Sequence, residues 1–119
     1  GLVPDMGATP FLQKLLGDDV ARELTYTNRV ILAEEAKELG LVTRVCENPV
    51  EEALKVAAEI ADRNPAAIRA AKRLLNNAPF ESAAETLLAE SVEQDAIIGS
   101  PNQVEAVMAN LEKREPKFS

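Results

Sequence analysis

The feature that most constrains this chain is a recurring pair, a residue that can cap a helix followed directly by proline. The pair occurs at Thr9–Pro10, Asn48–Pro49, Asn64–Pro65 and Ser100–Pro101. Proline suits the first turn of a helix because its missing N–H would have no partner there, and the residue before it supplies a side-chain oxygen to the free N–H groups. The pattern therefore predicts helices that begin at each of these pairs.

Apolar residues recur at helical spacing behind these starting points, and Ala, Leu, Glu and Lys dominate the composition. Gly17, Asn28 and Gly40 can each end a helix, the last in a Schellman motif with Leu41 behind it. We expect helices at about 10–16, 18–27, 33–39, 49–64, 65–77, 81–98 and 102–115.

Two short segments have a different pattern. Val30–Ile31 has the β-branched character of extended chain, and Leu41–Val45 is the best strand candidate. Cys46 follows in the same apolar run, so we expect a buried, inert thiol. The sequence predicts a mostly α chain with one or two short strands.

Charge and composition exclude several functions. The net charge is −7, which argues against nucleic-acid binding because no basic surface would displace counterions. No apolar run approaches the roughly 20 residues of a membrane span, so we expect no membrane partner. The chain has no histidine, which excludes a Ser-His-Asp triad and removes the commonest zinc ligand, and no metal site is expected. One cysteine cannot form an intrachain disulfide, so a reducing, cytoplasmic location is expected.

Three stretches resemble one known family. "GLVPDMGATPFLQKLLG" (1–17) is similar to a glycine-rich turn followed by a helix, and "LTYTNRVILAEEAKELGLVTRV" (24–45) to its T-G-R-x-x-x-A-E-E-A-x-x-x-G-L-V signature. "NPAAIRAAKRLLN" (64–76), together with "LEKREPKF" (111–118), resembles its helical C-terminus. The chain resembles, over its whole length and in order, the C-terminal part of the enoyl-CoA hydratase/isomerase (crotonase) superfamily.

The resemblance implies a division of the fold. Residues 1–64 would form the end of the ClpP/crotonase α/β superhelix, and residues 65–119 a C-terminal helical oligomerisation domain. Members of the family are roughly twice this long, so we expect a fragment whose missing N-terminal half precedes Gly1 and supplies the amides of the oxyanion hole. The isolated chain is then expected to be inactive, and the whole protein to form a homotrimer or hexamer.

The chain departs from the family pattern at three positions. Asn28 replaces the usual glycine, but asparagine also tolerates a left-handed turn. Ala8 replaces a second glycine in the opening turn. Leu32 stands where a serine often caps the following helix, and the loss of such a cap costs about 0.5–2 kcal/mol.

Asp5 is the candidate catalytic residue. The resemblance implies that hydratases use two glutamates, both upstream of Gly1, and usually have glycine at the position of Asp5. Several isomerases of the superfamily have aspartate there, which implies a general acid/base beside an acyl pocket formed by Leu2, Val3 and Met6. The alternative is that Asp5 is only a turn or helix-capping residue, a common use of aspartate after proline.

Lys113, Arg114 and Lys117 form a basic cluster at the end of the chain that could pair with CoA phosphates. Lys113 and Lys117 are the candidate CoA-binding residues, because family members often use a C-terminal lysine from a neighbouring subunit. The basic stripe Arg69, Lys72 and Arg73 is a second candidate for the same phosphates. Solvation of the surface is the alternative explanation for both clusters. No cofactor is expected apart from the coenzyme A of the thioester substrate.

The predicted function is therefore that of an acyl-CoA isomerase or hydratase, which shuttles a proton on an enoyl-CoA thioester with Asp5 as the acid/base. Enoyl-CoA hydratase proper is one alternative. A helical self-association module without catalysis of its own is another, and an unrelated acidic helical adaptor is a third.

Overall fold

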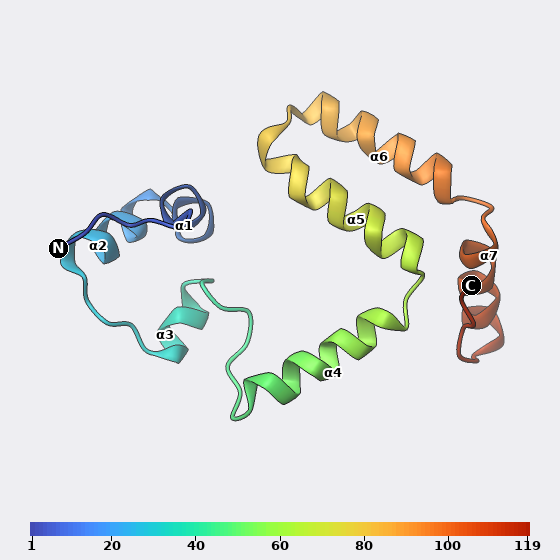
Figure 1. The fold of residues 1–119 in the computed structure, drawn as a ribbon, viewed down its shortest axis with the longest axis horizontal. Coiled ribbons are helices and arrows are strands. Elements are labelled where there is room, and N and C mark those ends of the chain that lie inside the picture. The colour runs from blue at the N-terminus through green and yellow to red at the C-terminus, as the bar shows by residue number, and fades with distance from the viewer. The chain divides into compact units, whose positions relative to one another are not determined.

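The computed structural model describes residues 1–119, the whole chain, as seven α-helices and one short 3-10 helix, with no β-strand. The helices belong to two compact units, Gly1–Pro49 and Val50–Ser119, which Figure 1 colours from blue to green and from green to red. The predicted division into a core part, 1–64, and an oligomerisation domain, 65–119, concerns membership of a larger fold and stays a prediction.

The first unit contains α1 (Ala8–Leu16), α2 (Asp18–Thr27) and α3 (Ala33–Glu38), and α1 packs against α2. Gly17, with φ +83°, separates the first two helices as predicted. The predicted Thr9 cap is wrong, because α1 already begins at Ala8 behind a left-handed Gly7. Pro10 is nevertheless in the first turn, where the helix requires no N–H from it.

Both ends of the loop between α2 and α3 confirm local predictions. Asn28 ends α2 in the left-handed conformation, with φ 50° and ψ 30°. Leu32 precedes α3 without a side-chain cap. At the far end of α3, Leu41 N–H donates to the Ala36 carbonyl at 2.8 Å and Gly40 N–H to the Lys37 carbonyl at 3.1 Å. These two bonds form the predicted Schellman motif.

The predicted strands at 30–31 and 41–45 are wrong, because both segments are irregular. The N–H groups of Leu41 and Val42 both donate to the Ala36 carbonyl at the end of α3, so they are not available to a neighbouring strand. A strand also needs a partner strand to be stable, and residues 1–119 contain none. Cys46, predicted to be buried, is exposed because no sheet covers it.

The second unit contains α4 (Pro49–Ala61), α5 (Pro65–Asn77), η1 (Ala78–Phe80), α6 (Ala83–Ile97) and α7 (Pro101–Glu112). α4 ends three residues before the predicted limit, because Asn64 begins the next helix. The Asn64 side chain accepts from Ala66 N–H at 3.0 Å, and Ser100 caps α7 through Gln103 N–H at 3.4 Å, both as predicted. Ser82 caps α6 in a capping box with Glu85.

In each unit the buried apolar side chains are alanines. The buried apolar residues are Ala21, Ala36, Ala70 and Ala109. α5 and α6 lie antiparallel (Figure 1), and Arg73 joins them with two hydrogen bonds of 2.6 Å to the Glu93 carboxylate. Large apolar side chains stay exposed on several helices. No helix is long and apolar enough to cross a membrane.

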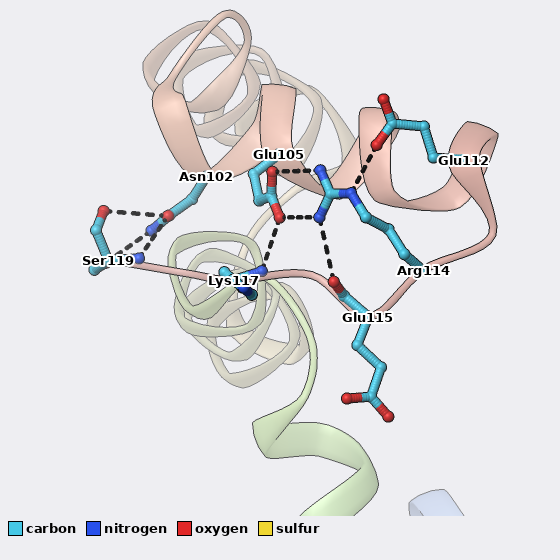
Figure 2. Close-up of polar contacts among 7 residues, drawn as sticks. All are labelled: Asn102, Glu105, Glu112, Arg114, Glu115, Lys117 and Ser119. Atoms are coloured by element: carbon cyan, nitrogen blue, oxygen red, sulfur yellow. Dashed lines mark hydrogen bonds and ion pairs between the residues drawn. The ribbon is translucent and has the colours of Figure 1, made fainter.

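The tail, residues 113–119, turns back along α7 and is held there by polar contacts (Figure 2). Arg114 binds the Glu105 carboxylate through Nη1 at 2.6 Å and Nη2 at 2.9 Å, and Lys117 N–H donates to the same carboxylate at 2.7 Å. Asn102 pairs with Ser119: its Nδ2 donates to the Ser119 carbonyl, and its Oδ1 accepts from Ser119 N–H, both at 2.9 Å. The Arg114 hydrogen bonds, with help from Lys117 N–H, lower the pKa of Glu105 to about 2.

An apolar contact accompanies this polar clamp. Pro116 and Phe118 are half-buried and line a cavity of about 190 Å³ with Asn64 and Ala109. The tail therefore connects the turn between α4 and α5 to α7. Lys117, between these two residues, is exposed.

Replacing the cap of α5 should destabilise the second unit. We expect Asn64→Ala to lower the free energy of unfolding by about 0.5–2 kcal/mol, because Ala66 N–H loses its acceptor. Urea titration of the protein at its full natural length measures the change. The matched control is Asn76→Ala, an exposed site inside the same helix, where we expect no loss because alanine is the better helix former. Equal effects of the two substitutions would contradict the assignment of the cap.

The contacts of Glu105 and Asn102 with the tail, which we call the tail clamp, should weaken in acid. The pKa of Glu105 is lower in the folded protein than its ordinary value of 4.5, so the stability it contributes is complete above pH 4.5 and is lost as the pH falls towards about 2. We expect the amide resonance of Lys117 in NMR spectra to move with the ionisation of Glu105, with a midpoint well below 4.5. Glu105→Gln should remove this transition and Glu112→Gln should keep it. A midpoint at the ordinary value would contradict the clamp.

Candidate functional site

Asp5 lies in the turn that leads into α1. Its backbone carbonyl accepts from Ala8 N–H at 2.9 Å, and the two residues between them, Met6 and Gly7, have positive φ values of 53° and 82°. This is the pattern of a type I′ turn. The positive φ favours glycine at position 7, and a Cβ there would also approach the ring of Phe11 to 3.1 Å.

The turn therefore uses the backbone of Asp5 and leaves its carboxylate for another role. The residue that caps α1 is Gly7, and no side-chain hydrogen bond caps that helix. The helix-capping explanation of Asp5 thus has no contact to support it. Asp5 is exposed.

The structure does not place Asp5 in a pocket of this chain. Leu2, Val3 and Met6, the predicted pocket residues, are 97%, 81% and 100% exposed. A groove of about 350 Å³ opens nearby in the same unit, lined by residues of α1 and α2 and by Pro4, without Asp5. The catalytic and pocket assignments stay predictions.

A polar network that the sequence analysis missed lies along this groove. Asp18 accepts from Arg22 Nε at 2.7 Å and from Gln13 Nε2 at 2.8 Å, and Arg22 Nη1 donates to the Tyr26 hydroxyl at 3.1 Å. The hydrogen bond from Arg22 lowers the pKa of Asp18. The spacing of Asp18, Arg22 and Tyr26, four residues apart, is the signal that would have predicted it.

Arg29, in the signature stretch 24–45, makes ion pairs with two glutamates. Its Nε donates to Glu23 on α2 at 3.0 Å, and its Nη2 donates to Glu35 on α3 at 2.7 Å. The guanidinium thus joins the two helices across the irregular loop, and its hydrogen bond lowers the pKa of Glu35. The two glutamates compensate the charge of Arg29, so this arginine has a structural role.

The two predicted CoA-binding lysines lie at the start and near the end of the tail, and both are exposed. Lys113 ends α7 in the left-handed conformation, with φ 55°. Lys117 is held by its backbone N–H on Glu105. In the alternative stripe, Arg69 and Lys72 are exposed, whereas Arg73 is paired with Glu93. Asp5 and the lysines belong to different compact units, and each assignment stays a prediction.

Known proteins match this chain over its whole length. The profile of the enoyl-CoA hydratase/isomerase family matches residues 1–119. A probable enoyl-CoA hydratase of Mycobacterium leprae is 35% identical over 121 residues, covering 100% of this chain and 47% of that protein. The mitochondrial methylglutaconyl-CoA hydratase of Mus musculus is 30% identical over 123 residues, covering 98% of this chain and 39% of that protein.

The fold agrees with this match. A crystal structure of a probable enoyl-CoA hydratase/isomerase from Mycobacterium abscessus has a TM-score of 0.94 and 32% identity, covering 100% of this chain and 50% of that one. The chain thus spans about half the length of the relatives it matches, and the resemblance suggested by the turn at Asp5 and by the Arg29 signature is confirmed. The chain belongs to the enoyl-CoA hydratase/isomerase (crotonase) family.

Proposed function

We propose that this chain is the C-terminal portion of an acyl-CoA isomerase or hydratase, and that Asp5 is the acid/base that moves a proton on the enoyl-CoA thioester. The observation that supports the proposal is that the backbone of Asp5, and not its side chain, makes the contact that closes the turn. The backbone carbonyl closes the turn, and no side-chain hydrogen bond caps α1, so neither the turn nor the cap uses the Asp5 carboxylate. The chemistry of the family needs a carboxylate that accepts a proton, and Asp5 can fill this role.

The reaction needs two kinds of group. The thioester carbonyl acidifies the neighbouring carbon, and backbone N–H groups stabilise the oxygen of the enolate that forms when the proton leaves. A carboxylate takes that proton and returns it to another carbon of the chain, so the double bond moves without net gain or loss of atoms. Asp5 supplies the second group. By resemblance to the family, the N–H groups come from the preceding half, so residues 1–119 alone should be inactive.

Hydration is the second candidate reaction, because the M. leprae and mouse relatives are both named as hydratases. A hydratase would use carboxylates upstream of Gly1 and would not need Asp5. The two reactions therefore differ in their dependence on this residue.

The proposal includes a place and an assembly for the protein. A cytoplasmic location fits the single free thiol, Cys46, and the family includes bacterial and mitochondrial relatives. We expect a homotrimer or hexamer, because α6 exposes the apolar residues Leu87, Leu88 and Val92. Self-association without catalysis is the alternative that the same surface supports.

Removal of the Asp5 carboxylate should stop isomerisation. We expect Asp5→Asn to lower kcat by about 10²- to 10⁴-fold with little change in KM, because the acid/base acts in the transition state. The measurement is turnover of enoyl-, dienoyl- and epoxide-type CoA thioesters by the protein at its full natural length.

Two further variants complete this test. Asp19→Asn, an exposed carboxylate on α2, should leave turnover unchanged. Asp5→Gly installs the residue usual in hydratases: retained hydration together with lost isomerisation would support the proposal. Full isomerase turnover in Asp5→Asn would refute the role of Asp5.

The apolar surface of α6 should be needed for assembly. Val92 is 62% exposed, and we expect Val92→Glu to shift the protein to smaller species, because a charge in an apolar interface is left unpaired. Sedimentation velocity measures the distribution. Gln94→Glu adds the same charge at an exposed polar site of the same helix and should change nothing. An unchanged oligomer in Val92→Glu would place the subunit interface elsewhere.

A further inference from the structure

We propose that Glu105 is a positioning residue: by holding the tail on α7 it fixes Lys117 for the phosphate groups of the CoA thioester. The inference rests on the proposed function, an enzyme that acts on a CoA thioester, and on the prediction from the family resemblance that Lys117 binds the CoA phosphates. It concerns a residue that makes no contact with the substrate.

The geometry makes Glu105 the centre of the clamp (Figure 2). Its Oε1 accepts from both Arg114 Nη1 and Lys117 N–H, and its Oε2 accepts from Arg114 Nη2. The Glu105 side chain is 23% exposed, against 50% for Glu112, the other carboxylate that Arg114 binds. One side chain of α7 thus holds the tail at two points, three residues apart.

The alternation of burial along the tail determines where Lys117 faces. Pro116 and Phe118 are half-buried at the cavity beside α7, whereas Lys117 between them is exposed. Successive side chains of an extended segment point to opposite sides. The same contacts that bury the flanking residues therefore turn the lysine towards solvent, with its backbone fixed on Glu105 and, two residues later, on Asn102.

Charge favours phosphate as the ligand. Arg114 pairs with both oxygens of Glu105 and offsets the negative charge of the carboxylate that binds Lys117 N–H, and the exposed Lys117 side chain can reach an anion in solvent. A lysine ammonium is a compact point charge that suits phosphate. Holding its backbone in advance removes part of the ordering cost that a free tail would incur on binding.

The test compares two ligands that differ in the phosphate-bearing part. Acetyl-CoA and acetyl-pantetheine have the same acyl group, which has no double bond to react, so the measurement does not depend on Asp5. We expect Glu105→Gln, in the protein at its full natural length, to raise the Kd of acetyl-CoA by roughly threefold to tenfold, the equivalent of one ordinary hydrogen bond. The Kd of acetyl-pantetheine should not change.

The sign of the effect separates positioning from simple electrostatics. Removing a negative charge close to Lys117 would by itself tighten the binding of a phosphate, whereas loss of the clamp weakens it. Glu112→Gln is the matched control, because it removes the same charge and the same partner, Arg114, without touching Lys117 N–H. We expect the Glu112 variant to bind acetyl-CoA as the wild type does.

Two other variants complete the design. Asn102→Ala frees only Ser119 and should raise the Kd of acetyl-CoA in the same direction by a smaller factor, which provides a readout if Glu105→Gln fails to fold. Lys117→Gln distinguishes the CoA-binding role of Lys117 from its positioning by the clamp. If it weakens acetyl-CoA binding while Glu105→Gln and Asn102→Ala do not, positioning by the clamp is refuted and the CoA role of Lys117 stands. If Lys117→Gln has no effect, both are refuted.

Discussion

The buried apolar side chains of this chain are all alanines, and this small core is the constraint on which the rest of the fold depends. Ala21, Ala36, Ala70 and Ala109 are its buried apolar residues, and each contributes only one methyl group. Burial of a methyl is worth about 0.8 kcal/mol, far less than the 1.5–3 kcal/mol of a leucine or phenylalanine. Small side chains let helix backbones approach closely, but they supply little of the energy needed to hold them. Helix caps and apolar partners must supply the rest of that energy.

The contacts that specify which helices lie side by side are polar. Arg29 joins α2 to α3, Arg73 joins α5 to α6, and Arg114 holds the tail on α7. Each arginine uses the fork of its guanidinium on carboxylates, which fixes direction as well as distance. Exposed ion pairs of this kind contribute little individually. Their value here is geometric, because they specify which helices are neighbours while large apolar faces stay open.

The features that could be predicted from the sequence are those decided within four or five residues. The caps at Asn64 and Ser100, the left-handed Asn28 and the Schellman motif at Gly40 all depend on neighbouring backbone groups, and all are present. The strand at 41–45 was predicted from the same local pattern, but it needs a second strand that residues 1–119 do not contain. The tail clamp joins residues 9 to 17 positions apart, and no local periodicity marks such a pair.

The predicted functional residues share a further property that composition would not reveal. Three non-glycine residues have positive φ: Met6, Asn28 and Lys113. Met6 follows Asp5 and is a predicted pocket residue, and Lys113 is a predicted CoA-binding residue. A left-handed conformation costs a residue such as methionine or lysine roughly 1–2 kcal/mol, so the surroundings must hold it there. The bond from Ala8 N–H to the Asp5 carbonyl does so for Met6, and the bond from Arg114 N–H to the Ala109 carbonyl does so for Lys113. Asp5 and Lys113 thus lie in or beside turns whose backbone is fixed by the adjoining helix, so the geometry of these turns positions both predicted site residues.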